Sequence, residues 1–310
     1  MMKYQPLGTL TSSRLGFGCW QLGGSHWGKV DPKECMKAVS LAVDLGINLF
    51  DTAPLYGAGK ADQRLLEALG EKRHDVIIAT KAGVERKGKQ ARSLLSSAHL
   101  KRDIEASLKR LKIDSIPLLQ IHWPCDQQTP LEETFSTLAR MREKGVIQNI
   151  GVCNYSAVEL LEMQKYAPIV STQHAYSMLR RECEAELIPF LQKQGIAAIA
   201  YEVLCRGLLS GKYRIAPQFP RSDLRAHDPR FQGRMFQQHQ LLIHNLSTAA
   251  RKLQISMPAI PIAWSLKRMN FALVGIKNRE QLLENHKAMA LLHKPKALHI
   301  IDQILQWIHK

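Results

Sequence analysis

Short apolar runs alternate along most of the chain with longer segments in which apolar residues recur at a helical period. Runs that are apolar throughout are typical of strands in a parallel sheet buried on both faces, and the segments between them are typical of amphipathic helices. The pattern therefore predicts repeated βα units. We expect strands at Gly16–Cys19, Ile47–Phe50, Val76–Thr80, Pro117–Ile121, Asn149–Val152, Ile169–Thr172, Ile196–Ala200 and Phe271–Gly275.

Residues that begin and end helices stand between these runs. Asp31-Pro32 and Ser156 are typical of helix starts, because a short polar side chain accepts a hydrogen bond from a free backbone N–H and proline suits the first turn. Gly145 and Gly195 are typical of the residue that follows a helix in a left-handed conformation. These signals support helices between the predicted strands.

The two ends of the chain predict further elements. Tyr4 to Leu15 predicts a short hairpin, and the closing segment predicts a helix that packs Ile300, Ile304, Leu305 and Trp307 on the barrel exterior. Right-handed crossovers that join eight parallel strands favour a closed barrel, because no hydrophobic edge then remains. No GxGxxG turn follows the first strand, which argues against a Rossmann domain. We therefore predict an α/β protein, a single (β/α)8 TIM barrel over residues 1–310 with an N-terminal β-hairpin and a C-terminal helix.

One connection, from Cys205 to Gln238, shows no clear periodicity. A connection of this length is usually functional, or else indicates that an element has been missed. The arginines in the segment favour a functional role.

Composition and charge narrow the class of protein. Hydrophobic residues make up 45% and charged residues 23%, as in ordinary soluble globular proteins. The formal net charge is +16, but the basic residues are scattered, apart from a short cluster of Arg86, Lys87, Lys89 and Arg92. No nucleic-acid-binding module is evident, so we expect a basic surface that attracts anionic small molecules and no nucleic-acid partner.

The cysteines and histidines do not indicate a disulfide framework or a metal site. The six cysteines include no CxxC pair, and no secretory leader is evident at Met1, so we expect free thiols and a cytoplasmic protein. His26, His174, His227 and His239 form no HExxH pattern, and we expect no metal. No apolar stretch approaches the roughly 20 residues that span a bilayer, so we expect no membrane insertion.

The polar residues that follow the predicted strands are the main functional clue, because the active site of an α/β barrel lies where strands end and helices begin. They include Asp51 and Tyr56, then Lys81, then His122. We expect Lys81 to lower the pKa of Tyr56, Asp51 to balance the charge of Lys81, and His122 to orient a substrate carbonyl oxygen. Together the four residues describe a general acid that protonates a carbonyl oxygen during reduction.

At these positions the chain resembles the aldo-keto reductases. The motifs LGFGCWQLGG, FDTAPLYGAG, IIATKAG, LLQIHWP, IGVCNYS, STQHAYSML, GLLSGKY and VGIKNREQLLEN occur in family order over nearly the whole chain. The resemblance implies an eight-stranded barrel that binds a nicotinamide cofactor and reduces a small carbonyl substrate. It also implies that Tyr56 is the acid and that Asp51, Lys81 and His122 support it.

The resemblance also implies which residues hold the cofactor. Asn154 and Gln173 would bind the nicotinamide carboxamide, Tyr201 would stack on its ring, and Lys277 would meet a 2′-phosphate. The full set of expected cofactor-binding residues is Cys153, Asn154, Gln173, Tyr201, Glu202, Leu204, Gly207, Lys212, Arg225, Gly275, Lys277, Gln281, Glu284 and Asn285. We expect Trp20 and Trp123 to line the substrate pocket.

The segment VGIKN supports cofactor binding independently of the resemblance. A helix that begins near Asn278 would present free N–H groups and partial positive charge to a phosphate. Lys277 and Arg279 add full charges, so we expect NADPH in preference to NADH.

Two departures from the family pattern concern the cofactor. Tyr201-Glu202-Val203-Leu204 stands where the family usually has a Ser-Pro-Leu stretch, which places a carboxylate near the expected pyrophosphate path. Cys153 replaces the more usual serine beside Asn154 and removes a good hydrogen-bond donor. Both changes predict weaker cofactor binding.

Two alternatives to a reductase remain open from the sequence. The chain could be a cofactor-binding regulatory or sensor subunit, which the Glu202 departure favours. It could also be a Schiff-base enzyme with Lys81 as nucleophile, which would require a depressed lysine pKa. The sequence does not identify the substrate or the oligomeric state.

Overall fold

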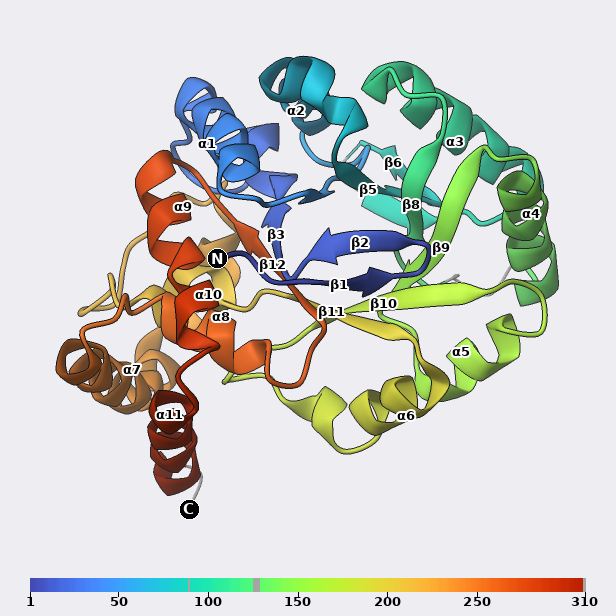
Figure 1. The fold of residues 1–310 in the computed structure, drawn as a ribbon. Coiled ribbons are helices and arrows are strands. Elements are labelled where there is room, and N and C mark those ends of the chain that lie inside the picture. Colours follow the sequence, from blue (N-terminus) through green and yellow to red (C-terminus); the bar gives the residue numbers. More distant parts are fainter. Residues whose placement is uncertain (89, 125–128, 309–310) are drawn as a thin grey trace.

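The computed structural model describes residues 1–88, 90–124 and 129–308. Eight parallel strands close into a barrel in the order β10-β11-β12-β3-β4-β5-β8-β9, which Figure 1 shows from one end. The barrel strands are β3 (Leu15–Gly18), β4 (Leu49–Asp51), β5 (Ile77–Ala82), β8 (Ile116–Ile121), β9 (Ile147–Cys153), β10 (Ile169–Ala175), β11 (Ala197–Tyr201) and β12 (Phe271–Gly275). The predicted (β/α)8 barrel is confirmed.

The strand boundaries differ from prediction in ways that matter for the site. Ile47 was expected in a strand, but its N–H bonds to the Ala42 carbonyl and ends the preceding helix. Asp51, by contrast, is the last residue of β4, and Gln173 lies inside β10 and not after it. Residues at these positions are held by the hydrogen bonds of the barrel and not by loops.

Helices surround the barrel as a ring (Figure 1). They are α1 (Pro32–Asp44), α2 (Lys60–Leu69), α3 (Ser97–Leu111), α4 (Leu131–Glu143), α5 (Ala157–Met163), α6 (Leu187–Gln194), α7 (Gly233–Leu253), α8 (Ala259–Ser265), α9 (Arg279–His286), α10 (Ala288–Leu291) and α11 (Pro295–Ile308). Short 3-10 turns are η1 (Cys19–Gly23), η2 (Gly70–His74), η3 (Glu182–Glu184), η4 (Cys205–Ser210), η5 (Leu224–His227) and η6 (Pro229–Phe231).

The predicted helix signals act as expected. The Asp31 side chain accepts from the N–H groups of Lys33 and Glu34 at the start of α1. Ser156 and Glu159 form a capping box at the start of α5, in which each side chain bonds to the other residue's backbone. Gly195 follows α6 with φ 67°, the conformation that favours glycine.

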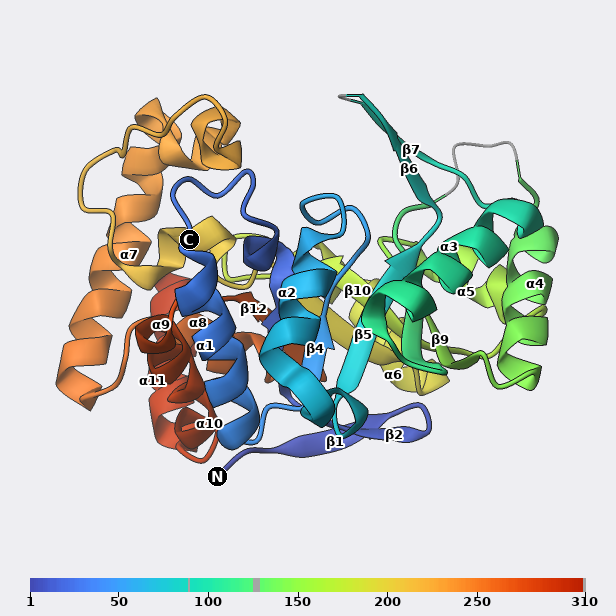
Figure 2. The same ribbon diagram turned by 90° about the horizontal axis from the view of Figure 1, so that it is seen from above.

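The predicted N-terminal hairpin consists of β1 (Tyr4–Leu7) and β2 (Leu10–Ser13). It covers the N-terminal end of the barrel, as Figure 2 shows. Leu7 is fully buried there, in a cluster with Leu49, Ile77 and Phe271 from the barrel strands. The hairpin therefore closes one end, so a ligand enters from the other.

A second hairpin, β6 (Val84–Lys87) and β7 (Gln90–Ser93), was missed by the sequence analysis. Arg86 and Arg92, expected in a loop cluster, lie on its two strands; the side chain of Lys87 and all of Lys89 lie outside the described parts. In Figure 2 this hairpin rises from the end of the barrel opposite β1 and β2.

The region from Cys205 to Gln238 is only partly irregular. It contains η4, η5 and η6, and α7 begins at Gly233, within the segment predicted to lack periodicity. The predicted C-terminal helix is present as α11 and packs against α7 and α8. Leu305 is buried, but Ile300 is 41% exposed, so its predicted packing is wrong, because it lies on the outer face of the helix. The Trp307 side chain lies outside the described residues.

Candidate active site

A buried ion pair lies at the C-terminal ends of the neighbouring strands β4 and β5. Lys81 Nζ donates to Asp51 Oδ1 at 2.6 Å, to the Thr52 carbonyl at 3.1 Å and to the Tyr56 hydroxyl at 3.3 Å. The Lys81 side chain is 1% exposed, so its charge is balanced almost entirely by these partners. The structure thus brings together Asp51, Tyr56 and Lys81, as the sequence predicts.

Two glutamines complete the surroundings of Asp51. Gln120 Nε2 and Gln173 Nε2 each donate to Asp51 Oδ2 at 3.0 Å, and Gln173 Nε2 also donates to Gln120 Oε1 at 3.1 Å. Hydrogen bonds to the ionised form stabilise a carboxylate. Sequence analysis missed Gln120, although a polar residue inside the apolar run LLQI was a signal of a functional position.

Tyr56 is positioned by a tight turn after β4. Its N–H bonds to the Ala53 carbonyl, and the following Gly57 has φ 61°. A Cβ atom at Gly57 would lie 2.3 Å from the Gly23 carbonyl oxygen of η1. The turn can approach η1 this closely only because residue 57 is glycine.

His122 follows β8 and lies beside Tyr56. Its ring stands edge-on to the Tyr56 ring, with the centroids 6.0 Å apart and an interplanar angle of 81°. Burial and the nearby charge of Lys81 hold the pKa of His122 well below its usual value. The imidazole is therefore neutral at pH 7 and has one N–H to donate.

The expected acidification of Tyr56 is wrong for the free protein. Burial raises the pKa of Tyr56 above its usual value, and the attraction of Lys81 offsets this only in part because Asp51 acts in the opposite sense. Burial would lower the pKa of Lys81, but Asp51 and Tyr56 outweigh it and the pKa is raised. Tyr56 is thus a protonated phenol held next to a permanent ammonium.

Aromatic side chains form the walls around Tyr56. The Trp20 ring stacks on the Tyr56 ring with centroids 5.6 Å apart, and Trp27 meets Trp20 edge-on at 5.1 Å. Trp123 lies on the other side, 5.0 Å from the His122 ring. Trp20 and Trp123 both line the cavity, as predicted for a substrate pocket.

All of the predicted site residues line one cavity of about 900 Å³. This volume is near the upper end of the range of about 300–1,000 Å³ for small-molecule and cofactor sites. The cavity is also lined by polar residues that the sequence analysis did not assign to the site, among them Gln21, Arg86 and Arg180. Most of these lie on loops or on the missed hairpin, where no strand-end rule points to them.

Several expected cofactor contacts carry hydrogen bonds of their own. Tyr201 OH donates to Asn154 Oδ1 at 3.0 Å. The amide nitrogen of Gln173 is occupied by Asp51 and Gln120, so its carbonyl oxygen is the atom left for a ligand. Burial raises the pKa of Cys153 to about 12, so its thiol is not ionised at neutral pH.

Glu202 does not lie as an unpaired carboxylate in the cavity. It accepts from Arg206 Nε at 2.7 Å and from Arg230 Nη2 at 3.1 Å, and Arg230 and Arg206 also pair with Asp228 at 2.6 and 3.4 Å. We call these four residues the Glu202 clasp. The clasp balances the charge of Glu202 within the protein, which removes the repulsion expected from this departure.

Three cations gather at another part of the same cavity. Arg225 pairs with Asp223 at 2.6 Å, and Arg225 and Lys277 both donate to the Trp27 carbonyl, at 3.2 and 2.5 Å. Loss of hydration, together with repulsion from Arg225 and Lys277, lowers the pKa of Lys212 to about 8. Because Asp223 is the one carboxylate described beside these three cations, the group keeps a net positive charge and favours the binding of an anion.

The start of α9 is partly occupied by its own side chains. Asn278 caps the helix by accepting from the Gln281 N–H at 2.9 Å, and Gln281 Oε1 accepts from the Lys277 N–H at 3.0 Å. The helix begins where predicted, but these two N–H groups are not free for a phosphate, which corrects the expectation. Arg279 lies 3.7 Å from Glu34 and is half exposed.

The described residues, 1–88, 90–124 and 129–308, offer neither a metal-binding group nor a membrane-spanning helix. In that part of the chain no three His, Cys, Asp or Glu side chains are grouped so as to hold a metal ion. No helix there is both long enough and apolar enough to traverse a bilayer.

Comparisons with known proteins agree with this geometry. Residues 14–306 match the family model described as the Aldo/keto reductase family. The chain is 35% identical to the aldo-keto reductase YhdN of Bacillus subtilis, over 88% of this chain and 84% of that protein. It is 33% identical to a protein of Escherichia coli named NADH-specific methylglyoxal reductase, over 93% of this chain and 94% of that protein.

Solved structures show the same likeness. The glycerol dehydrogenase AKR11B4 from Gluconobacter oxydans is 31% identical and superimposes with a TM-score of 0.88, covering 98% of this chain and 94% of its own. The holo form of the aldo-keto reductase AKR11C1 from Bacillus halodurans is 26% identical, with a TM-score of 0.79 over 98% of this chain and 96% of its own. The chain therefore belongs to the aldo/keto reductase family.

Proposed function

We propose that this protein reduces an aldehyde or ketone to an alcohol, uses NADPH in preference to NADH, and donates the proton from Tyr56. The observation that carries the proposal is the Tyr56 hydroxyl, 3.3 Å from the buried Lys81 ammonium and in the same cavity as Lys212, Arg225 and Lys277. A positioned acid and an anion-binding group in one cavity suit the reduction of a carbonyl by a phosphate-bearing cofactor.

The residues present fit a dinucleotide. The cavity extends from Tyr56 and His122 to Gln281, Glu284 and Asn285 on α9, and Lys212, Arg225 and Lys277 also line it. Lys212, Arg225 and Lys277 would hold phosphate groups, and Asn154 and the carbonyl oxygen of Gln173 would hold the carboxamide. When bound, the reduced nicotinamide supplies the hydride.

The protein's own side chains would handle the proton. The carbonyl oxygen gains negative charge during reduction, and Tyr56 donates its hydroxyl proton to that oxygen. Lys81, which stays protonated beside Asp51, stabilises the resulting phenolate. The neutral His122 donates a hydrogen bond to the same oxygen and fixes its place.

The preference for NADPH rests on the positive charge of Lys277, which lines the cavity together with Lys212 and Arg225. Arg279, which the sequence also suggested for this role, lies against Glu34 and does not line the cavity. The relative from Escherichia coli is named NADH-specific, and Glu280 and Glu284 also line this end of the cavity. The two cofactors are therefore compared directly in the test.

The test is a panel of carbonyl compounds followed by the loss of cofactor absorbance, with NADPH and NADH in parallel. We expect simple aldehydes to be reduced when NADPH is the cofactor. The value of kcat/KM for the same aldehydes should be lower with NADH. The Tyr56→Phe variant should lose about 100- to 10,000-fold in kcat while NADPH still quenches its tryptophan fluorescence. Full activity of this variant would disprove the role of Tyr56, and no turnover of any carbonyl would disprove the function.

The two alternatives lose their support from the geometry. The hypothesis of a sensor subunit depended on Glu202 as a carboxylate near the expected pyrophosphate path. Glu202 is paired with Arg206 and Arg230 within the clasp. The Schiff-base reading required a depressed pKa of Lys81, and that pKa is raised.

A further inference from the structure

The cavity carries cations at two separate places. Lys212, Arg225 and Lys277 lie on the side of β11 and β12, where the proposed cofactor phosphates bind. Arg86 and Arg180 also line the cavity, but they come from the hairpin after β5 and from the loop after β10. Because β5, β8, β9 and β10 are consecutive in the barrel, these two arginines flank the arc that contains His122 and Trp123.

Neither arginine has a carboxylate partner among the described residues. Arg86 Nε donates to the Gly88 carbonyl at 3.2 Å, and Arg180 bonds through its backbone to Ser177. Arg92, on the same hairpin as Arg86, differs because it pairs with Glu85 at 3.1 Å and does not line the cavity. Within residues 1–88, 90–124 and 129–308, the two cavity arginines are therefore unbalanced charges.

The carboxylates that line the cavity do not offset these charges. Asp51 is held by Lys81, and Glu202 is held in its clasp. The other two, Glu280 and Glu284, lie at the far end of the cavity, on α9. Within the described residues, the arc around His122 and Trp123 thus has positive charge without a matching carboxylate.

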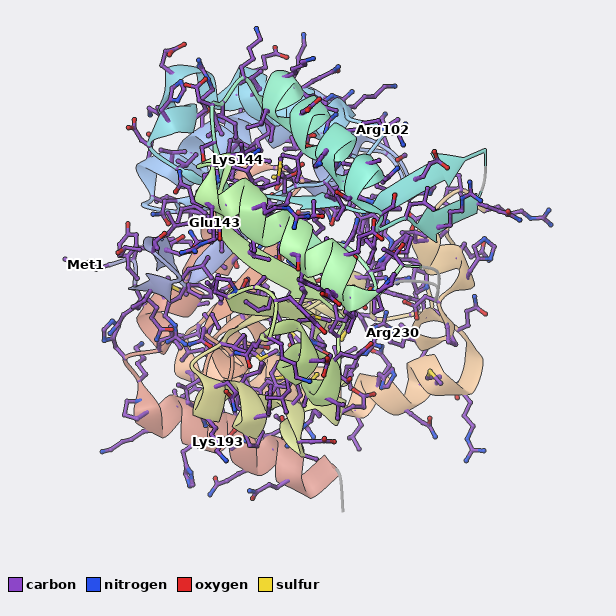
Figure 3. All side chains as sticks on the ribbon, turned by 90° about the vertical axis from the view of Figure 1, so that its right-hand side faces the viewer. Met1, Arg102, Glu143, Lys144, Lys193 and Arg230 are labelled. Carbon is purple, nitrogen blue, oxygen red and sulfur yellow. The ribbon has the colours of Figure 1, made fainter. Side chains whose placement is uncertain are left out.

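The position of the hairpin suits contact with a substrate. In Figure 2, β6 and β7 project beyond the barrel at the end where the site lies. The segment that carries Arg230 reaches the same end, and Figure 3 shows Arg230 and Met1 toward opposite ends of the molecule. Arg86, on β6, and Trp123, after β8, both line the cavity at this end of the barrel.

We propose that Arg86 and Arg180 bind an anionic group of the substrate, so that the preferred substrates are aldehydes or ketones that carry a carboxylate or a phosphate. Guanidinium groups form paired, charge-assisted hydrogen bonds with both anions. Both arginines are exposed at the open end of the cavity, and the net charge of +16 favours the approach of anions. The inference rests on the proposed reductase function, whose substrate class it specifies.

A matched pair of aldehydes tests the inference. With NADPH, kcat/KM for para-carboxybenzaldehyde should exceed that for its methyl ester by about tenfold, because the two differ mainly in charge. Glyceraldehyde phosphate against glyceraldehyde gives the phosphate arm and shows which anion is preferred. The advantage of the charged member should shrink at high salt.

Variants locate the effect. We compare kcat/KM for the acid, divided by kcat/KM for the ester, among variants. This ratio should fall by about three- to tenfold in Arg86→Gln and by a similar factor in Arg180→Gln. The control is Arg92→Gln, which removes the same charge from the same hairpin but outside the cavity, and its ratio should not change. An equal loss in Arg92→Gln would indicate a general surface field and overturn the proposed site.

A binding measurement separates this inference from the function. Quenching of tryptophan fluorescence gives the Kd of para-(hydroxymethyl)benzoate and of its methyl ester, with oxidised cofactor present. The Kd of the acid should be lower than that of the ester. In the two arginine variants the Kd of the acid should rise. If acid and ester are bound and reduced equally, the anion site is wrong and the reductase stands. If no aldehyde is reduced but the acid still binds preferentially, the function is wrong and the anion site stands.

Discussion

Two charge networks serve the same cavity in different ways. Asp51 and Lys81, with Gln120 and Gln173, come from barrel strands and are almost fully buried. The Glu202 clasp comes from η4, η6 and the residues beside them, where Glu202 and Arg206 have φ of 55° and 56°. The first network holds one ammonium in place beside Tyr56, and the second holds loop segments together at the rim.

The comparison shows that burial and backbone support go together. A lysine can be buried beside a phenol only where neighbouring strands fix its counter-ion, because an unpaired buried charge is costly. Charges on loops are more exposed, so each ion pair contributes less to stability, and several pairs together hold the loops. The strands thus hold the buried ion pair beside Tyr56, and the loops hold the more exposed ion pairs at the rim.

The largest expected effect would come from removing the charge of Lys81. Lys81→Met leaves Asp51 buried without its ion pair, so the free energy of unfolding should fall by about 3 kcal/mol or more, and kcat by at least about 100-fold. Denaturant unfolding and aldehyde turnover measure the two losses. In the double variant Asp51→Asn with Lys81→Met, stability should return and activity should not. A single variant of unchanged stability would contradict the buried pair.

A smaller effect is expected on the loop side of the comparison. Lys277→Gln removes one of three cations, so the Kd for NADPH should rise by about tenfold and the Kd for NADH by less. Fluorescence titration measures both constants. The control is Lys193→Gln on α6, an exposed residue that does not line the cavity, and this change should alter neither constant. Equal changes in the two constants would rule out a 2′-phosphate contact.

The pH dependence of the free energy of unfolding should show the effect of burying His122. The pKa of His122 is lower in the folded protein than its unfolded value of about 6.5, so the unfolded chain binds more protons as the pH falls below that value. Above about pH 6.5 this histidine should therefore not affect the free energy of unfolding. As the pH falls below that value, the free energy of unfolding should decrease by up to about 1.4 kcal/mol per pH unit for each such histidine.

His122→Gln isolates this contribution, because His174, whose pKa is lowered by burial to about 4, acts in the same pH range. Unfolding curves between neutral and mildly acidic pH should be flatter for the variant than for the parent protein. Identical slopes would mean that His122 is not held neutral by burial.

The smallest effect is expected from the clasp itself. Glu202→Gln should lower the free energy of unfolding by about 1 kcal/mol and speed proteolysis in the segment between η4 and α7. Mass spectrometry of early fragments locates the cuts. Glu186→Gln, an exposed glutamate for which the described residues provide no ion pair, is the control. Cleavage at the same rate in both variants would show that the clasp does not hold the loops.

Much of the fold and part of the site could be predicted from local pattern. Apolar runs and helix caps are local properties, and the rule that parallel strands end on one rim brings Asp51, Lys81 and His122 together without coordinates. The hairpin of β6 and β7 was missed because its strands are short and polar, and Gly88 alone is a weak turn signal beside a run of basic residues.

The sequence alone therefore determined the barrel, its family and the polar groups at its strand ends, since periodicity and topology are set by neighbours along the chain. Only the tertiary structure decided that Gln120 supports Asp51, that Tyr56 keeps its proton, and that Glu202 is neutralised by Arg230. Each of these depends on burial and on contacts between segments distant in sequence. Such contacts set the local cost of charge, which no linear pattern records.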